Sequence, residues 1–396
     1  MSEPQPRRAA VTGIGVIAPN GPSTESFWKS TQEGISVLDR VTREGCEHLP
    51  LRVAGEVRDF EASEAVEERH LVQTDRFTHF ALAASDLALD DARLGQADTG
   101  QAPFSVGVVT AAGSGGGEFG QRELQQLWGK GSRYVGPYQS IAWFYAASTG
   151  QISIRRGFKG PCSVVAADEA GGLDALAHAA RAARRGTDVI VAGATEAPLA
   201  PYSVVCQLGY GELSTADDPA RAYRPFTAEA CGFVPAEGGA MLVVEDERTA
   251  LERGASVRAT VAGHAATFTG ASRWAESRQG LTRAIGGALE EAGCAPGEID
   301  VVFADALGAH GGRVPVTAPK TGIGRGYCAA SVLDAAAAVL AMEHGLIPPT
   351  PNVFDVCHDL DLVTGRARAA ELHTALVLSR GLMGSNSALV LRRGTP

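Results

Sequence analysis

The feature that most constrains this chain is a weak internal repeat. Two Ala-rich segments, LDALAHAARAARRG at 173–186 and LDAAAAVLAMEHG at 333–345, each begin with Leu-Asp, end at Gly and follow a turn of small residues. Two such helices predict a duplicated fold in which they are buried and packed against each other. Ala-rich helices also arise from composition alone, so the repeat needs support from the rest of the chain.

Strand and helix patterns alternate along the 396 residues. Short apolar runs at 9–19, 104–111, 162–168 and 187–194 predict buried strands, and the segments between them have helical periodicity. This rhythm indicates an α/β protein with parallel strands. The polar stretch EDERTALERGAS is followed by a new strand pattern that resembles the first one. We therefore expect two halves, residues 1–250 and 251–396.

Charge and composition exclude several classes of function. The net charge is −10, which makes nucleic acid and anionic membrane surfaces poor partners. The sequence has no run of 18 apolar residues and no signal-peptide pattern. The seven Cys and nine His are scattered, without CxxC or HxxxH spacing, so neither disulfides nor a metal site is expected. We predict a cytoplasmic protein whose cysteines, Cys162 included, are small core residues.

Five ordered motifs resemble those of the β-ketoacyl synthase family over essentially the whole chain. They are VTGIGVIAPNG at 11–21, STADDPARAYRPFTAEACGFVPAEGGAMLVVE at 214–245, PVTAPKTGIGR at 315–325, IPPTPN at 347–352 and SRGLMGSNSALVL at 379–391. The resemblance implies a thiolase-like α/β fold, in which duplicated βαβ halves form five layers in the order α-β-α-β-α. It also implies which positions carry the family's chemistry.

That chemistry uses a cysteine at a helix N-terminus, where the helix dipole favours the thiolate, together with two histidines and a lysine. In this sequence Glu169 stands at the cysteine position and Lys320 is retained. Asp305 and Arg325 stand at the two histidine positions. A one-turn slip would offer His310 instead of Asp305, but it would break the geometry between strand and site. The expected site is therefore degenerate, with no catalytic residue and no metal.

This pattern of loss resembles the chain-length factors of type II polyketide synthases. The segments AGGLDA at 170–175, WFYA with TGQIS at 143–153, and GQRELQQLW at 120–128 carry that resemblance. It implies a heterodimer with a catalytic ketosynthase α subunit, and work on chains bound to acyl carrier protein without a cofactor. The subunit would set poly-β-ketone length during decarboxylative condensation of malonyl units.

The resemblance also points to a tunnel and an interface. Gly117, Gly120 and Leu124 share one helical face, because they are spaced i, i+3 and i+7. Two glycines would leave that face open and give a long product, unless the glycine run is only a flexible helix start. The aromatic residues Trp143, Phe144 and Tyr145 suit an interface anchor, or else lie in a buried helix.

Glu169 has two further interpretations. Beside Lys320 and Arg325, with Asp305 nearby, it would form a buried salt-bridge cluster that fills the former catalytic cavity, because a buried charge needs partners. Alternatively, the chain acts on its own as a malonyl-ACP decarboxylase or acyltransferase that uses Glu169 as acid or base. A third possibility is a binding or structural homologue outside polyketide synthesis.

Overall fold

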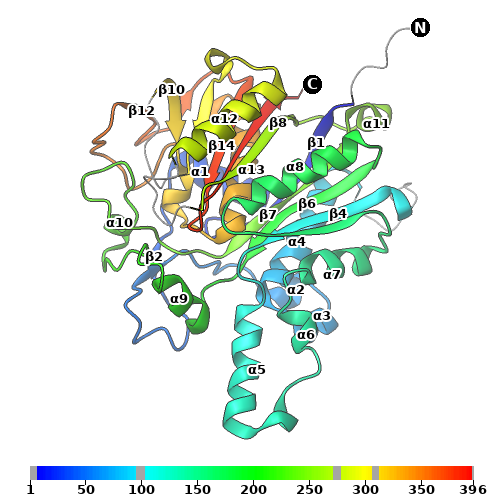
Figure 1. Cartoon of the computed structure of the whole chain (residues 1–396), viewed down its shortest axis with the longest axis vertical. Helices are drawn as coiled ribbons and strands as arrows, with labels where there is room; N and C mark the ends of the chain where they lie inside the picture. The colour runs from blue at the N-terminus through cyan, green and yellow to red at the C-terminus, as the bar shows by residue number, and fades with distance from the viewer. Residues whose placement is uncertain (1–6, 95–102, 271–277, 306–311, 395–396) are drawn as a thin grey trace.

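The structure is a computed structural model that describes residues 7–94, 103–270, 278–305 and 312–394. Its centre is an eleven-stranded sheet with the strand order β12-β10-β9-β14-β15-β8-β1-β7-β6-β4-β5 (Figure 1). In chain order the strands are β1 Ala9–Ile17, β4 Val106–Ala112, β5 Cys162–Ala166, β6 Val189–Glu196, β7 Gly238–Asp246, β8 Ala259–Phe268, β9 Val301–Phe303, β10 Gly312–Thr317, β12 Leu360–Leu362, β14 Thr374–Arg380 and β15 Ser385–Arg393. Two short ribbons pair β2 Asp39–Arg40 with β3 Val53–Ala54 and β11 Leu346–Ile347 with β13 Arg368–Ala369.

The helices of the described residues differ widely in length. They are α1 Thr24–Glu33, α2 Ala62–Ala65, α3 Glu68–Gln73, α4 Arg76–Asp91, α5 Gly117–Lys130, α6 Gln139–Ala142, α7 Ala147–Arg156, α8 Gly171–Arg184, α9 Pro201–Leu208, α10 Pro219–Ala222, α11 Glu247–Glu252, α12 Arg278–Ala292 and α13 Tyr327–His344. In the parts of the chain that the structure describes, no helix is both long and apolar enough to cross a membrane.

The sheet is built from one strand pattern used twice. Along β1-β7-β6-β4-β5 the successive pairings are antiparallel, antiparallel, parallel and parallel. The pairings along β8-β15-β14-β9-β10 follow the same sequence. The two patterns join where β1 pairs antiparallel with β8. The expected duplication is confirmed, but the expectation of parallel strands holds for only part of each half, because β7 and β15 run antiparallel to both neighbours.

The layers follow the predicted order. Helices α8 and α13 pack against each other and contact strands of both halves, while α4 covers the outer face of the first half and α12 that of the second. Every side chain of α13 from Cys328 to Met342 is buried, which explains why this helix is rich in Ala. The thiolase-like α-β-α-β-α arrangement is confirmed. The boundary expected at residue 250 falls inside α11, just before β8 opens the second pattern.

Glycines let the outer helices approach the sheet closely in both halves. A Cβ atom on Gly13 or Gly15 of β1 would collide with backbone atoms of α4, and one on Gly263 of β8 would collide with backbone atoms of α12. The two halves thus use the same device at equivalent strands. An alanine at any of these positions would force the helix away from the sheet.

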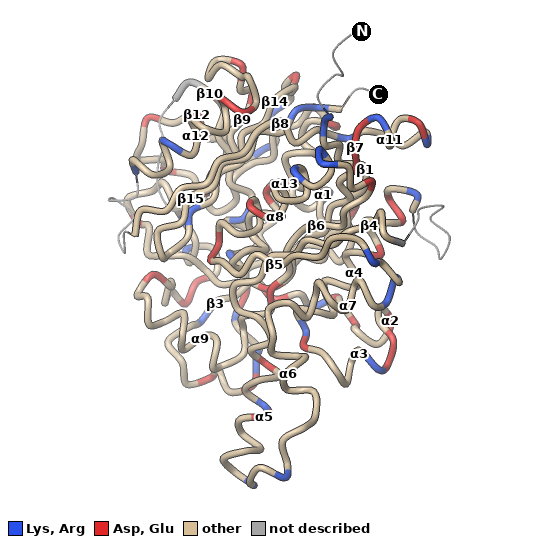
Figure 2. The backbone as a smooth tube through the Cα atoms, turned by 45° about the vertical axis from the view of Figure 1, so that its right-hand side comes forward, with Lys and Arg blue, Asp and Glu red and all other residues tan. Residues whose placement is uncertain are grey.

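Helix α5 projects away from this body, at the bottom of Figure 1. We call residues 117–138, which include α5 and the turn Ser132–Tyr134, the helical arm. In the view of Figure 2 the backbone positions of acidic and basic residues alternate over the molecule, without a long basic stretch. One edge of the sheet is β5, which pairs with β4 on one side and ends the strand order on the other.

Candidate functional site

The former nucleophile position lies in the turn that leads into α8, and Glu169 is 2% exposed there. Its Oε2 accepts a hydrogen bond from the backbone N–H of Leu382 at 3.0 Å, and its Oε1 lies 3.9 Å from Nε of Arg325. Its backbone carbonyl accepts hydrogen bonds from the hydroxyls of Ser331 and Ser379, each at 3.0 Å. Glu169 therefore ties the turn to α13, to β14 and to the segment after β14.

Arg325 and Asp305, at the former histidine positions, form a buried ion pair. Nη1 of Arg325 lies 3.1 Å from Oδ2 of Asp305 and also donates to the Asp305 carbonyl at 3.0 Å. Nη2 of Arg325 donates to the carbonyl of Arg380, whose backbone N–H in turn donates to Oδ1 of Asp305 at 2.9 Å. Asp305 follows β9 and Arg325 precedes α13, so the pair joins two elements of the second half.

Lys320 makes its close contact with a residue that sequence reasoning missed. Its Nζ lies 2.5 Å from Oδ2 of Asp334 and 4.0 Å from Oδ1 of Asp305. Burial raises the pKa of the Asp334 carboxyl to about 6, although Lys320 opposes the shift. A signal for Asp334 was present, because it is the aspartate of the repeated Leu-Asp pair. Its counterpart Asp174 accepts hydrogen bonds from other partners.

These contacts confirm the expected salt-bridge cluster of Glu169, Asp305, Lys320 and Arg325, and they add Asp334, the nearest partner of Lys320. All five side chains are at most 3% exposed. Burial raises the pKa of Glu169, and the Arg325 guanidinium opposes that shift. Each buried charge in this cluster has an oppositely charged neighbour, and the side chains together occupy the position of the former catalytic site.

The thiol that contacts this turn is Cys328, whose Sγ donates to the carbonyl of Asp168 at 3.0 Å. Burial raises the pKa of Cys328 well above its ordinary value, so the thiol stays protonated and unreactive. The expectation that every cysteine is a core residue is wrong for four of them. Cys162, Cys206, Cys231 and Cys357 are exposed, and Cys162 is exposed because it lies on the edge strand β5. His310 lies outside the described residues.

The face expected to be open at the arm is occupied within the chain itself. A Cβ atom on Gly117 would collide with the Ser203 hydroxyl of α9, and one on Gly120 would lie 2.9 Å from Cδ1 of Trp143. An added methyl group would require the Ser203 hydroxyl to rotate or the Trp143 ring to shift, so both glycines face neighbouring side chains of the same chain. Leu124, one turn further on, is 41% exposed. The role of these positions in a tunnel stays a prediction.

The three aromatic residues expected at an interface lie in the bend between α6 and α7, not in a buried helix. Trp143 is 50%, Phe144 54% and Tyr145 36% exposed. Further large apolar side chains on the arm, on α7 and on α9 are also exposed: Trp128, Tyr134, Ile154, Tyr202 and Val205. We call this set, with Leu124, the apolar patch. Large apolar side chains exposed on several elements of one region favour an interaction surface there.

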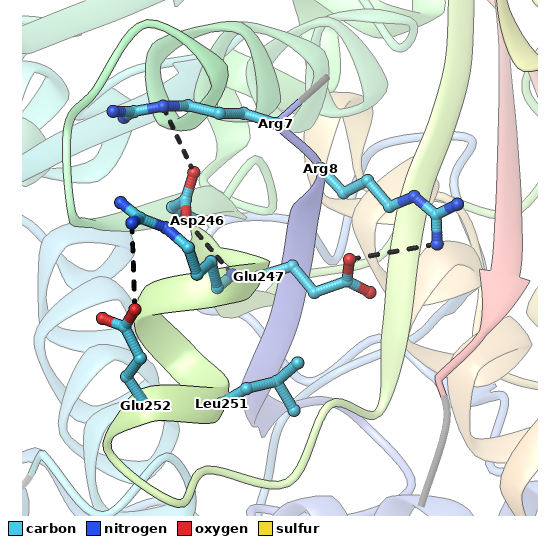
Figure 3. Close-up of a pocket in the computed structure, with 7 residues that line it drawn as sticks. Arg7, Arg8, Asp246, Glu247, Leu251 and Glu252 are labelled. Atoms are coloured by element: carbon cyan, nitrogen blue, oxygen red, sulfur yellow. Dashed lines mark hydrogen bonds and ion pairs between the residues drawn. The ribbon is translucent and has the colours of Figure 1, made fainter. Parts of the chain in front are cut away.

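The hollow drawn in Figure 3 lies elsewhere and is lined by ion pairs. Arg7 faces Asp246 at 3.8 Å, and Arg8 faces Glu247 at 3.9 Å, between the start of β1 and α11. It contains none of the residues predicted from the sequence. Both arginine side chains are about half exposed or more, and ion pairs of exposed arginines at these separations contribute little and are screened by salt. This hollow is therefore no candidate for the functional site.

The comparisons with known proteins agree with this geometry. Residues 7–250 match the β-ketoacyl synthase N-terminal domain and residues 308–354 the C-terminal domain. The chain is 74% identical over 405 residues to a putative polyketide beta-ketoacyl synthase 2 of Streptomyces coelicolor, covering 98% of this chain and 95% of that one. It is 48% identical to the tetracenomycin polyketide synthase ketoacyl synthase beta subunit of Streptomyces glaucescens, covering 99% and 100%.

Among solved structures, the ishigamide ketosynthase/chain length factor matches with a TM-score of 0.89 at 26% identity, over 98% of this chain and 99% of that one. A chain of the AntDE:AntF complex, described as a type II PKS acyl carrier protein in complex with its ketosynthase, matches with a TM-score of 0.85 at 26% identity, over 98% of this chain and 100% of that one. The chain therefore belongs to the β-ketoacyl synthase family and, within it, to the chain-length-factor type, the β subunit of type II polyketide synthases.

Proposed function

We propose that this chain is the chain-length factor that pairs with a catalytic ketosynthase α subunit and shapes the tunnel in which a poly-β-ketone grows on acyl carrier protein. The observation that carries the proposal is the conversion of the catalytic position. Glu169 cannot form the thioester on which chain transfer depends, and its carboxylate is already held by Leu382 and Arg325. The condensing chemistry then belongs to the partner subunit.

The rival function, decarboxylation or acyl transfer through Glu169, lacks support in this geometry. A general acid or base must reach the proton that it transfers, and Glu169 is 2% exposed with both oxygens facing partners. The histidines that would stabilise an enolate are replaced by Asp305 and Arg325, which bind each other. Cys328 offers no substitute nucleophile, because its thiol is buried and protonated.

The surface supports a large partner. The apolar patch includes exposed side chains of the arm, α7 and α9. Strand β5 exposes part of every side chain along its length, whereas β4 beside it is fully buried. An open edge strand with apolar residues is normally covered in a native protein. A ketosynthase α subunit seated against β5 and the patch would cover both at once. The proposal also places the pair in the cytoplasm, which the seven free thiols support.

Co-expression with a candidate ketosynthase α subunit and acyl carrier protein tests this proposal. We expect the two large chains to co-purify one to one and to make a polyketide from malonyl units, while this chain alone neither decarboxylates malonyl-ACP nor makes product. Trp143→Asp should abolish co-purification, because it places a charge in the apolar patch. The matched control Leu251→Asp, on exposed α11, should not. Decarboxylation by the isolated chain would overturn the proposal.

A further inference from the structure

One buried aspartate, Asp75, caps two helices at once. Its Oδ1 accepts a hydrogen bond from the backbone N–H of Phe77, in the first turn of α4, at 3.2 Å. Its Oδ2 accepts one from the backbone N–H of Phe119, in the first turn of α5, at 2.7 Å. Helix α5 has Gly116 at its own N-cap, which supplies no capping side chain. The Phe119 N–H, which has no acceptor within its own helix, is therefore bonded by the N-cap residue of α4.

The charged side chains around Asp75 have other close partners, so its carboxyl group interacts mainly with the two backbone N–H groups. Glu118 and Arg122 of α5, Arg76 and His79 of α4, and Arg43 line a hollow of about 160 Å³ beside it. Arg43 and Arg76 are held by the carboxylate of Glu237, at 2.6 and 3.0 Å. Arg122 lies over the ring of Phe119. Asp75 is 3% exposed, and burial raises the pKa of its carboxyl to about 7.

Two other carboxylates hold the chain before α5 and within the arm, but neither links the arm to α4. Glu196, at the end of β6, accepts hydrogen bonds from the N–H groups of Gly113 and Ser114, at 2.5 and 3.1 Å, so it holds the turn that leads to α5. Glu123 accepts one from the N–H of Gly136, where the chain returns. Together with the hydrogen bond from the Tyr202 N–H of α9 to Oε1 of Gln121, at 2.7 Å, the bond to Asp75 therefore constrains the direction in which α5 leaves the body.

We propose that Asp75 is a positioning residue for chain-length control, which fixes the α5 arm and its Leu124 face relative to α4 and the sheet by capping both helices. This inference rests on the proposed function, because the direction of the arm affects product length only if the arm borders the growing chain. A carboxylate is needed, since its two oxygens can both accept, whereas an amide has one accepting oxygen.

Asp75→Asn in the co-purified pair tests the inference. Asparagine is as good an N-cap as aspartate, so the cap of α4 is retained while the amide nitrogen faces the Phe119 N–H. Above pH 7, where the Asp75 carboxyl is ionised, we expect amide hydrogen exchange in residues 117–124 to accelerate about tenfold, the scale of one lost bond to a charged acceptor. Exchange across α4 should stay unchanged, and mass spectrometry should find products of several lengths. Unchanged exchange in α5, or faster exchange with a single unchanged product, would overturn the inference.

The matched control is Asp246→Asn. Asp246 is also a buried aspartate at an N-cap, but it caps only α11, through Arg248 and Thr249, at the opposite end of the molecule from α5 (Figure 1). It should change neither α5 exchange nor product length, and a change equal to that of Asp75→Asn would overturn the inference. Leu124→Phe separates the two proposals. If it shifts product length and Asp75→Asn does not, only the Asp75 inference fails; if neither does, the proposed function fails.

Discussion

At the scale of single residues, the former catalytic position is now occupied by buried charged side chains that bind one another. A carboxylate before a helix N-terminus is favoured by the helix dipole, but a buried carboxylate also needs opposite charge and donors. Glu169 finds Arg325 and the Leu382 N–H, and Arg325 finds Asp305. The substitutions are thus mutually supporting, because each provides what another needs in order to be buried.

This arrangement predicts a structural effect for changes at Glu169. Glu169→Ala leaves Arg325 with one carboxylate fewer and the Leu382 N–H without an acceptor, so we expect it to lower the unfolding free energy by about 3 kcal/mol. Glu169→Gln keeps the volume and one accepting oxygen and should cost less. Urea unfolding of the co-purified pair measures both. The interpretation is contradicted if either variant loses most of its turnover while stability and pairing are unchanged.

At the scale of elements, the helical arm is the part of the chain that projects from the body (Figure 1). The side chain of Ser203 packs close to Gly117, and that of Trp143 packs close to Gly120. Gly117→Phe is therefore an ambiguous test of a tunnel, because the added side chain would first disturb the contact between α5 and α9. Leu124 lies on the same face and is 41% exposed, so its side chain can be enlarged without displacing a packed neighbour.

We expect Leu124→Phe to shorten the polyketide made by the reconstituted pair, by at least one malonyl-derived unit, because it adds bulk on the face that the proposal assigns to the tunnel. The control is Gln125→Phe, which adds a ring about 100° around the same helix, at another exposed position. It should leave the product unchanged. Mass spectrometry of the products distinguishes the two. Equal product lengths for wild type and Leu124→Phe would remove Leu124 from the tunnel.

At the scale of the whole molecule, burial raises the pKa of certain carboxyl groups, so the stability of the fold depends on pH. The pKa of Glu196 is raised to about 7 from an ordinary value of 4.5, because burial disfavours its ionised form. Between these values the folded chain holds a proton that the unfolded chain has released. The stabilisation is therefore fully present below about pH 4.5 and is lost as the pH rises to 7. Asp75 acts in the same direction.

Glu196→Gln should remove this pH dependence at one site. We expect the unfolding free energy of the wild type, relative to that of the variant, to fall by about 3 kcal/mol between pH 4.5 and 7 and to stay level above pH 7. Taking the difference cancels other titrating groups, including the buried histidines. Urea unfolding at a series of pH values measures it. A constant difference across this range would mean that Glu196 is already ionised in the folded chain at low pH.

Much of the architecture was predictable because it depends on local pattern and on repetition. The Leu-Asp helices at 173–186 and 333–345 indicated the two central helices, α8 and α13, and the alternation of elements indicated the α/β class. The mixed strand directions were not predictable in this way, since a buried apolar strand looks the same whichever way it runs. Cys162 was misplaced for a related reason: a short apolar run does not show that its strand ends the sheet.

The sequence by itself determined which chemistry was lost, because Glu169, Asp305 and Arg325 are not side chains that can replace a cysteine and two histidines. Only the tertiary structure decided what these residues do instead. In the folded chain Lys320 pairs with Asp334, and Asp75 caps two helices. The physical reason is that residue identity limits chemistry directly, whereas hydrogen bonds and ion pairs between distant segments depend on how close-packed helices and strands bring them together.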